Sequence, residues 1–317
     1  MIFEQVGIIG CGLIGGSFAQ AIKKAGIAKH IIGYSKSPTG TQEAKAAGIL
    51  NETAPSAMQA ASGSDLILLA VPVGSMAKIF SDITPLISSG TLLMDVGSTK
   101  QNVVAAAREH LKKKIACFVP AHPIAGKNLS GYQAADPDLF AHAKVILTPL
   151  DETSPRHLNN AILIWETIGA QVQLMQPEEH DQALGAVSHL PHLLAFAYMK
   201  SVIDHAKSEH FLSLAGDGFK DFTRIAASDP TLWRDVFMAN KTEMLEQICA
   251  FKEILTQYEA TLQANEHIKL LDLLQKTSQT RLEWQSSRQS QTQPLSAETS
   301  LSEKQEKDGV FTRLSAH

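Results

Sequence analysis

The sequence predicts an α/β fold in which a doubly wound, mainly parallel sheet is followed by an all-helical domain. Short apolar runs alternate with helical stretches through the first half of the chain, the pattern of a parallel sheet covered by helices. Strand signals end near residue 176, and helical spacing of apolar residues continues from there to residue 284. The 317 residues, 44% of them apolar, are enough for about two domains. We therefore expect a sheet domain over residues 1–175, a helical domain over 176–284 and a disordered tail over 285–317.

A glycine-rich turn opens the sheet domain. The segment Gly10-Cys11-Gly12-Leu13-Ile14-Gly15-Gly16 follows a predicted buried strand and precedes a predicted helix. In such a turn the first glycine allows the tight bend, the second lets a ligand approach the backbone, and the third lets the helix pack on the strand. The unpaired N–H groups and the dipole at the helix N-terminus favour a pyrophosphate. The pattern predicts a Rossmann-type dinucleotide site, rather than a merely structural turn, with contacts from Gly10, Gly12, Leu13, Ile14 and Gly15.

The end of the second predicted strand indicates which dinucleotide binds. A carboxylate about 20 residues after the glycine turn commonly binds an unmodified ribose 2′-hydroxyl. Here the strand over residues 31–34 is followed by Ser35, Lys36 and Ser37, with no carboxylate. Hydroxyl groups and an ammonium group suit a 2′-phosphate better, so the sequence favours NADP over NAD. If Lys36 is only a solvated turn residue, the protein would accept NAD or both cofactors.

The remaining strands are expected from five apolar runs. They are Leu66–Val71, Thr91–Val96, Ala116–Pro120, Val145–Thr148 and Gln171–Leu174. In this architecture ligands bind at the carboxyl ends of the strands. Val71, which ends the first of these runs, Pro72, which follows it, and Ser98, which follows the second run, are therefore expected at the cofactor cleft.

The helical domain carries more apolar surface than one small bundle needs to bury. Predicted helical stretches cover residues 183–205, 229–264 and 266–283. Along the last two stretches the recurring apolar residues are Leu255, Tyr258, Leu262, Ile268, Leu271 and Leu274. A homodimer formed through these helices is the simplest explanation. Beyond Trp284 the composition becomes polar, which is typical of a disordered tail.

Composition excludes several classes of protein. A formal charge of −4 gives no indication of a nucleic-acid partner. The first residues lack the basic start of a signal peptide, and no apolar run is long enough to span a bilayer, so we expect a cytoplasmic protein. Three scattered cysteines form neither a metal-binding pattern nor a disulfide framework. Of these, Cys11 is expected to be a small buried filler of the glycine turn rather than a reactive thiol.

Three segments outside the glycine turn carry candidate chemistry. His122 follows a predicted strand, a placement suited to a general base at the cleft. Ser188-His189-Leu190-Pro191-His192 puts two histidines on one helical face, and ligand hydrogen bonding or packing explains this spacing better than a metal. Asp221 and Arg224 lie one helical turn apart, and an arginine can bind a carboxylate bidentately. Each segment also has an explanation without chemistry. His122 would be a structural histidine, the two histidines would pack at a helix junction, and Asp221 and Arg224 would form an exposed ion pair.

Together these segments resemble the prephenate/arogenate dehydrogenase family, the oxidoreductases of tyrosine biosynthesis. The resemblance runs from about Val6 to Trp284, and it is specific because several motifs recur in one order and spacing. The motifs are Gly10–Ser17, Asp95–Lys100, His122–Gly126 with Ser130-Gly131, Ser188–His192, and Phe222–Ala226 through Trp233.

The resemblance implies an oxidative decarboxylation. A hydride passes from the ring carbon that bears the 4-hydroxyl to the nicotinamide, while the ring carboxylate leaves as carbon dioxide. By matching motif, His122 would accept the proton of the 4-hydroxyl, and Ser98 would bridge that hydroxyl, His122 and the nicotinamide. Arg224 would bind a substrate carboxylate, with Asp221 orienting it. The residues expected to line the substrate pocket are Ser188, His189, His192 and Trp233, the last covering it within the chain or across the dimer.

The choice of substrate depends on a carboxylate. Arogenate carries an ammonium where prephenate has a keto group, so an arogenate enzyme should place an acidic residue near that end. In several relatives an acidic residue follows the histidine-proline motif, whereas Asn128 stands there in this chain. This favours prephenate, unless Asp136 or Asp138 supplies the charge.

Two rival functions remain open from the sequence. One is another NADP-linked dehydrogenase with a helical second domain, of the 3-hydroxyacid or imine reductase type. The other is a non-catalytic NADP(H)-sensing dimer, which would need no base at His122.

Overall fold

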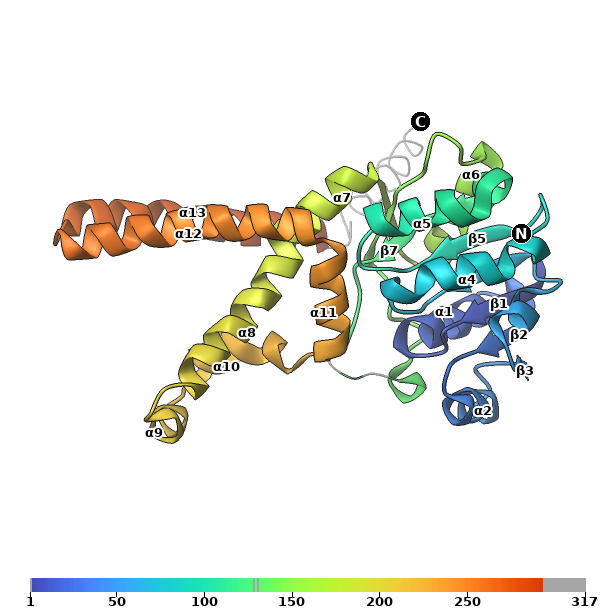
Figure 1. Cartoon of the computed structure of the whole chain (residues 1–317), viewed down its shortest axis with the longest axis horizontal. Coiled ribbons are helices and arrows are strands. Elements are labelled where there is room, and N and C mark those ends of the chain that lie inside the picture. Colours follow the sequence, from blue (N-terminus) through green and yellow to red (C-terminus); the bar gives the residue numbers. More distant parts are fainter. Residues whose placement is uncertain (1, 128, 130, 293–317) are drawn as a thin grey trace, which may run out of the picture. The chain divides into compact units, whose positions relative to one another are not determined.

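The computed structural model of the protein describes residues 2–127, 129 and 131–292. The chain, drawn in Figure 1, divides by its internal contacts into two units, residues 1–249 and residues 250–317. No helix within the described residues has the length and apolar character needed to cross a membrane.

A six-stranded parallel sheet forms the centre of the first unit. Its strands are β1 (Phe3–Ile9), β2 (Ala28–Tyr34), β3 (Glu52–Thr53), β4 (Leu66–Leu69), β5 (Leu92–Asp95) and β6 (Phe118–Val119). Their order across the sheet is β3-β2-β1-β4-β5-β6, and all neighbours are parallel. The order reverses between β1 and β4, the place where ligands bind in doubly wound sheets. The glycine turn therefore follows the strand at this switch point.

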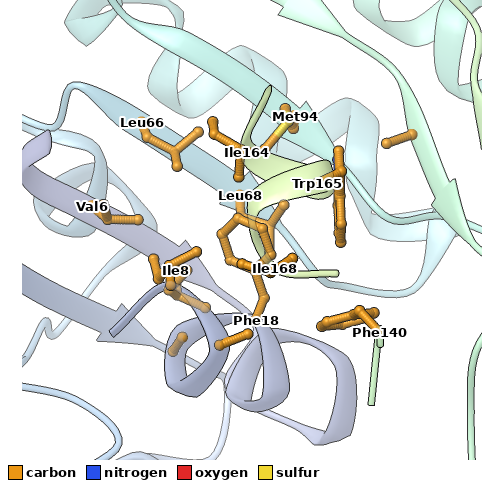
Figure 2. Close-up of a cluster of buried hydrophobic side chains, with 14 of the residues drawn as sticks. Val6, Ile8, Phe18, Leu66, Leu68, Met94, Phe140, Ile164, Trp165 and Ile168 are labelled. Carbon is orange, nitrogen blue, oxygen red and sulfur yellow. The ribbon is translucent and has the colours of Figure 1, made fainter. Parts of the chain in front are cut away.

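Two hydrophobic cores cover the two faces of this sheet. Successive residues of a strand point to opposite faces, so Ile8 lies in one core and Ile9 in the other. The core drawn in Figure 2 joins strand residues to α1 (Leu13–Lys24) and α6 (Pro155–Thr167). In it the ring centroid of Trp165 lies 5.1 Å from that of Phe18 and 5.3 Å from that of Phe140. The other core packs α3 (Ala57–Ala61), α4 (Met76–Ile83) and α5 (Gln101–Leu111) against the opposite face. Helices on both faces confirm the predicted doubly wound architecture.

Six α-helices surround the sheet within the described residues. They are α1 (Leu13–Lys24), α2 (Pro38–Ala46), α3 (Ala57–Ala61), α4 (Met76–Ile83), α5 (Gln101–Leu111) and α6 (Pro155–Thr167). Ser37 and Ser56 cap α2 and α3 by accepting a backbone N–H bond with their hydroxyls. Short 3₁₀ turns cover Val73–Ser75, Thr84–Leu86, Lys112–Cys117 and Tyr132–Ala134.

A second, three-stranded sheet differs from the prediction. The strands β7 (Ala121–Pro123), β8 (Lys144–Leu147) and β9 (Gln171–Leu174) form it, with β7 antiparallel and β9 parallel to β8. The last two apolar runs were expected in the main sheet, but strand pairing depends on tertiary contacts that a run of apolar residues does not encode. His122, which was expected directly after a strand, lies within the strand β7, opposite Ile146.

Only helices follow β9 among the described residues, as predicted. The first unit contains α7 (Pro177–Leu184), a π-helical turn (Gly185–His189), α8 (Leu190–Ile203), α9 (Ser208–Ser213), α10 (Asp217–Thr223), a 3₁₀ turn (Arg224–Ala227), α11 (Pro230–Ala239) and the start of α12 (Lys241–Gln263). The second unit contains the rest of α12 and α13 (His267–Thr292). Helix α13 continues past Trp284 to Thr292, so residues 285–292 are helical and not the disordered start of a tail. The rest of the predicted tail lies outside the described residues.

Candidate active site

The glycine turn has the geometry of a phosphate-binding turn. Gly10 has φ +104°, a conformation that side chains rarely adopt, and its N–H donates to the Tyr34 carbonyl at 2.7 Å. Gly12 is the N-cap of α1, and a Cβ there would meet open space. A Cβ on Gly15 would collide with the backbone oxygen of Gly10, so this glycine lets the helix approach the strand. The first turn of α1 carries no acidic side chain and no side-chain cap, which suits an anionic ligand. These residues fit a dinucleotide pyrophosphate.

Cys11 and Ser35 join the glycine turn to the end of β2. The backbone N–H of Cys11 donates to the Ser35 hydroxyl at 2.7 Å. Burial raises the pKa of the Cys11 thiol to about 11, which confirms the expected role of a buried filler. The residue after Ser35, Lys36, is exposed, and neither these two positions nor Ser37 carries a carboxylate. The predicted cofactor residues Val71 and Pro72 follow β4, next to β1 in the sheet.

A buried ion pair fixes the loop that carries Ser98. The ammonium group of Lys100, fully buried, donates to the Asp95 carboxylate and, at 2.7 Å, to the backbone oxygen of Ala121. The same carboxylate accepts the N–H groups of Gly97 at 2.8 Å and Ala121 at 3.1 Å. Since Ala121 precedes His122, this pair ties the Ser98 loop to the strand of the candidate base.

His122 ends a chain of buried hydrogen bonds. Its Nδ1 lies 2.8 Å from Nε2 of His180, and His180 Nδ1 lies 2.7 Å from the Asp181 carboxylate. His180 and Asp181 are fully buried, whereas His122 is only partly buried. Burial lowers the pKa of His122 well below its ordinary value, and the nearby His180, Lys100 and His189 lower it further. His122 is therefore neutral at neutral pH, which is the form that accepts a proton.

The π-helical turn between α7 and α8 places His189 beside this group. Asn240 donates from its amide nitrogen to the Asp181 carbonyl at 2.8 Å and lies 3.0 Å from Nδ1 of His189. The carbonyl contact identifies the amide nitrogen, so His189 Nδ1 accepts and its Nε2 carries the proton. The backbone of Ser98 interacts with the same ring, and burial lowers the pKa of His189 to about 4. π-turns of this kind are frequent at functional sites.

Trp233 packs on both histidines of the predicted pair. Its ring stacks on His192 with a centroid distance of 3.5 Å and an interplanar angle of 19°, and it meets His189 edge-on at 6.1 Å. His192 Nδ1 lies 2.8 Å from the Ser188 carbonyl, so Nδ1 donates and Nε2 is left as an acceptor. Burial lowers the pKa of His192, and the charge of Arg224 lowers it further. The tryptophan thus covers the two histidines within one chain.

The structure brings together residues that the sequence proposed separately. The Ser98 loop, His122, His189, His192, Ser188 and Trp233 lie in one connected group, and Arg224 is near enough to influence His192. Asp221 lies on α10, one turn before Arg224, and is exposed. Asn128 lies outside the described residues.

Sequence reasoning assigned no role to four residues that hold this group. Asp95 and Lys100 occur in a motif quoted for the resemblance, but only the structure shows them as a buried pair. His180 and Asp181 lie next to each other in the chain, which alone indicates no site. Their contacts with His122 and with the start of α5 span 58 and 81 residues of sequence.

Comparison with known proteins connects both parts of the chain to one family. Residues 18–174 match the family model described as prephenate dehydrogenase, nucleotide-binding domain, and residues 176–276 match prephenate dehydrogenase, dimerization domain. Cyclohexadienyl dehydrogenase of Zymomonas mobilis is 31% identical over 89% of this chain and 96% of its own. The crystal structure of Aquifex aeolicus prephenate dehydrogenase with hydroxyphenyl propionate and NAD⁺ has a TM-score of 0.84 and 34% identity, covering 89% of this chain and 99% of that one. Synechocystis arogenate dehydrogenase has a TM-score of 0.75 and 25% identity over 88% of this chain and 99% of that one. The chain therefore belongs to the prephenate dehydrogenase family.

Proposed function

We propose that this chain catalyses the NAD(P)-dependent oxidative decarboxylation of prephenate, or of arogenate, in tyrosine biosynthesis. Similarity along both domains to proteins named prephenate, cyclohexadienyl and arogenate dehydrogenase supports this activity. The observation that carries it is one group of side chains beside the sheet that bears the glycine turn. The group consists of His122, the Ser98 loop, His180 and His189. The same similarity argues against a reductase of another class and against a non-catalytic sensor.

His122 is the general base in this proposal. It accepts the proton of the substrate 4-hydroxyl while the bound nicotinamide supplies the hydride acceptor, and the ring loses its carboxylate as carbon dioxide. Ser98 shares the hydrogen bond of that hydroxyl. Because its imidazole is neutral before the reaction, one ring nitrogen has the free lone pair that accepts this proton. The substitution His122→Asn should abolish turnover and leave cofactor affinity unchanged, as measured by fluorescence titration with reduced cofactor. Turnover within about tenfold of wild type would refute the assignment, since a general base contributes about 10²–10⁴-fold.

Arg224 binds a substrate carboxylate in this proposal, and Asp221 orients it. The closeness of its charge to His192 supports a position at the pocket that Trp233 covers. Because a guanidinium binds a carboxylate bidentately and an ammonium does not, Arg224→Lys should raise KM for the substrate about tenfold or more. An unchanged KM would remove Arg224 from the site. Ser188, His189 and His192 complete the substrate-binding set.

NADP is preferred over NAD in this proposal. The support is the absence of a carboxylate at Ser35, Lys36 and Ser37, together with the exposed ammonium of Lys36. A charge-assisted hydrogen bond contributes about 1.5–3 kcal/mol, or roughly 10- to 100-fold. Lys36→Gln should therefore lower kcat/KM for NADP by that factor and leave kcat/KM for NAD unchanged. Ser35→Asp keeps an acceptor for the Cys11 N–H and should shift the preference toward NAD. Equal use of both cofactors by the wild type would overturn the preference.

Prephenate is the preferred substrate in this proposal. The two acidic residues that could otherwise receive the arogenate ammonium are engaged by lysines: Asp136 pairs with Lys127 at 2.9 Å and Asp138 with Lys24 at 2.6 Å. Asn128 at the motif position then carries no charge. Asn128→Asp should raise kcat/KM for arogenate relative to prephenate. A wild type that already prefers arogenate, with no response to this change, would refute the argument.

The active form is a homodimer assembled through the helical domain, residues 176–284, in this proposal. The matched model is that of a dimerization domain, and apolar side chains on α12 and α13 are exposed: Leu255, Leu262, Ile268, Leu271 and Leu274. Light scattering should give the mass of two chains, and Leu271→Glu should lower it to one. A monomeric wild type at all concentrations would refute this assembly.

A further inference from the structure

Two buried residues link the candidate base to the protein interior. His180 and Asp181 lie in the middle of α7, His122 lies in β7, and the three side chains form a continuous series of hydrogen bonds. The distances are 2.7 Å from Asp181 to His180 and 2.8 Å from His180 to His122. The two interior residues are inaccessible to solvent. They therefore make no direct contact with a ligand, and their side chains reach the site through His122.

The contacts of Asp181 determine which nitrogen carries the proton in each of these two hydrogen bonds. Its two carboxylate oxygens accept the backbone N–H groups of Lys100 at 2.7 Å and Gln101 at 2.8 Å. Burial raises the pKa of Asp181. The hydrogen bonds from His180 and from these two N–H groups lower it by more than burial raises it, so the pKa lies below its ordinary value. Asp181 is therefore an ionised acceptor. His180 Nδ1 must be the donor to it.

The tautomer of His122 follows from that of His180. Burial keeps His180 neutral by lowering its pKa, so with the proton on Nδ1 its Nε2 has a lone pair and accepts. The nitrogen facing it, Nδ1 of His122, must then carry a proton. A neutral His122 with its proton on Nδ1 has its remaining lone pair on Nε2. That nitrogen is the one available to a substrate hydroxyl.

We propose that His180 and Asp181 are positioning residues that hold His122 in the tautomer whose Nε2 accepts the substrate proton. The proposal rests on the proposed function, in which His122 is the base. When the hydroxyl O–H bond breaks, its proton is bound at Nε2, and the Nδ1 proton stays in its bond to His180. The carboxylate of Asp181 then stabilises the positive charge formed on His122, while Lys100 opposes it and is itself balanced by Asp95.

Asp181 also has a structural role, which the test must separate from positioning. By accepting the N–H groups of Lys100 and Gln101 it caps the N-terminus of α5 from another helix. Substitution of Asp181 would disturb both roles. His180 makes no such contact with α5, so it is the residue to change.

A matched pair of variants at His180 tests the proposal. In His180→Gln the side-chain oxygen can still accept from His122 Nδ1, whereas His180→Leu removes the acceptor and leaves the Asp181 cap in place. We expect kcat with prephenate to fall by about 10²–10³ in the leucine variant, with KM for prephenate and cofactor within about threefold of wild type. The glutamine variant should keep kcat within about tenfold. Circular dichroism and thermal unfolding identify variants that fail to fold.

Nitrogen NMR of ring-labelled histidine reads the tautomer directly in the wild-type protein. The signals of His122, identified by their loss in His122→Asn, should show a protonated Nδ1 and an unprotonated Nε2. A proton on Nε2, a wild-type kcat in His180→Leu, or equal losses in two folded His180 variants would overturn the proposal. If His122→Asn remains active, the base assignment itself fails. If it is inactive while His180→Leu is fully active, only the positioning role fails.

Discussion

The depressed pKa of His189 predicts a measurable loss of stability in acid. Burial lowers this pKa from 6.5 to about 4 in the folded protein. At a pH below about 6.5, His189 of the unfolded chain binds a proton that the same residue in the folded chain does not bind. The contribution of His189 to stability is therefore complete above about pH 6.5 and is lost as the pH falls toward the pKa in the folded protein. One pKa unit corresponds to about 1.36 kcal/mol, so between about pH 7.5 and about pH 5 this residue alone costs about 2 kcal/mol.

The assay is urea unfolding of wild type and His189→Asn at the two pH values. Asparagine places an oxygen where Nδ1 accepts from Asn240, so the variant keeps that hydrogen bond and loses the titration. The other buried histidines titrate in both proteins, so their contribution is shared, apart from the change in the pKa of His122 when the charge of His189 is removed. Both proteins are measured at one protomer concentration, because dimerisation contributes to apparent stability. The acid loss should be about 2 kcal/mol smaller in the variant. Equal losses would refute the reasoning.

Three further predictions follow from other sites. Gly15→Ala should lower the free energy of unfolding by about 1–3 kcal/mol, because its Cβ meets backbone, whereas Gly12→Ala should leave stability unchanged and weaken cofactor binding in a fluorescence titration. Lys100→Met should cost about 3–5 kcal/mol in urea unfolding, since it leaves a buried carboxylate without its partner, and a loss below about 1 kcal/mol would contradict the buried pair. Cys11, with its pKa near 11, should react with iodoacetamide far more slowly than the exposed Cys249, as peptide mass spectrometry would detect.

The features that the sequence predicted well are those encoded within a few residues. The glycine turn lies between a strand and a helix because Gly10 and Gly15 each solve a local steric problem. The strand Gln171–Leu174 was predicted to the residue. The segment Ser188–His192, which contains the two histidines, lies at a helix junction. Local pattern was enough for these features because sterics and side-chain periodicity act over one turn or strand.

The features that the sequence did not predict depend on contacts between distant segments. The sequences of β8 and β9 do not indicate which sheet they join, and the separate sheet arises because β8 pairs with β7 and β9 pairs with β8. The π-turn that presents His189 has no local signal, because one extra residue per turn is stabilised by packing. Asp181 is a helix residue with an ordinary local pattern, and its importance comes from the backbone N–H groups at the start of α5 and from His180, which in turn contacts His122 on β7. A single sequence without tertiary contacts contains no sign of these bonds.

The most direct test of the account measures prephenate oxidation by the purified chain and by His122→Asn side by side. Reduced nicotinamide and carbon dioxide should form in equal amounts, 4-hydroxyphenylpyruvate should be the product, and NADP should react faster than NAD. The variant should bind cofactor normally and turn over no substrate. Failure of the wild type to oxidise either prephenate or arogenate would contradict the proposed function, and full activity of the variant would contradict the role of His122.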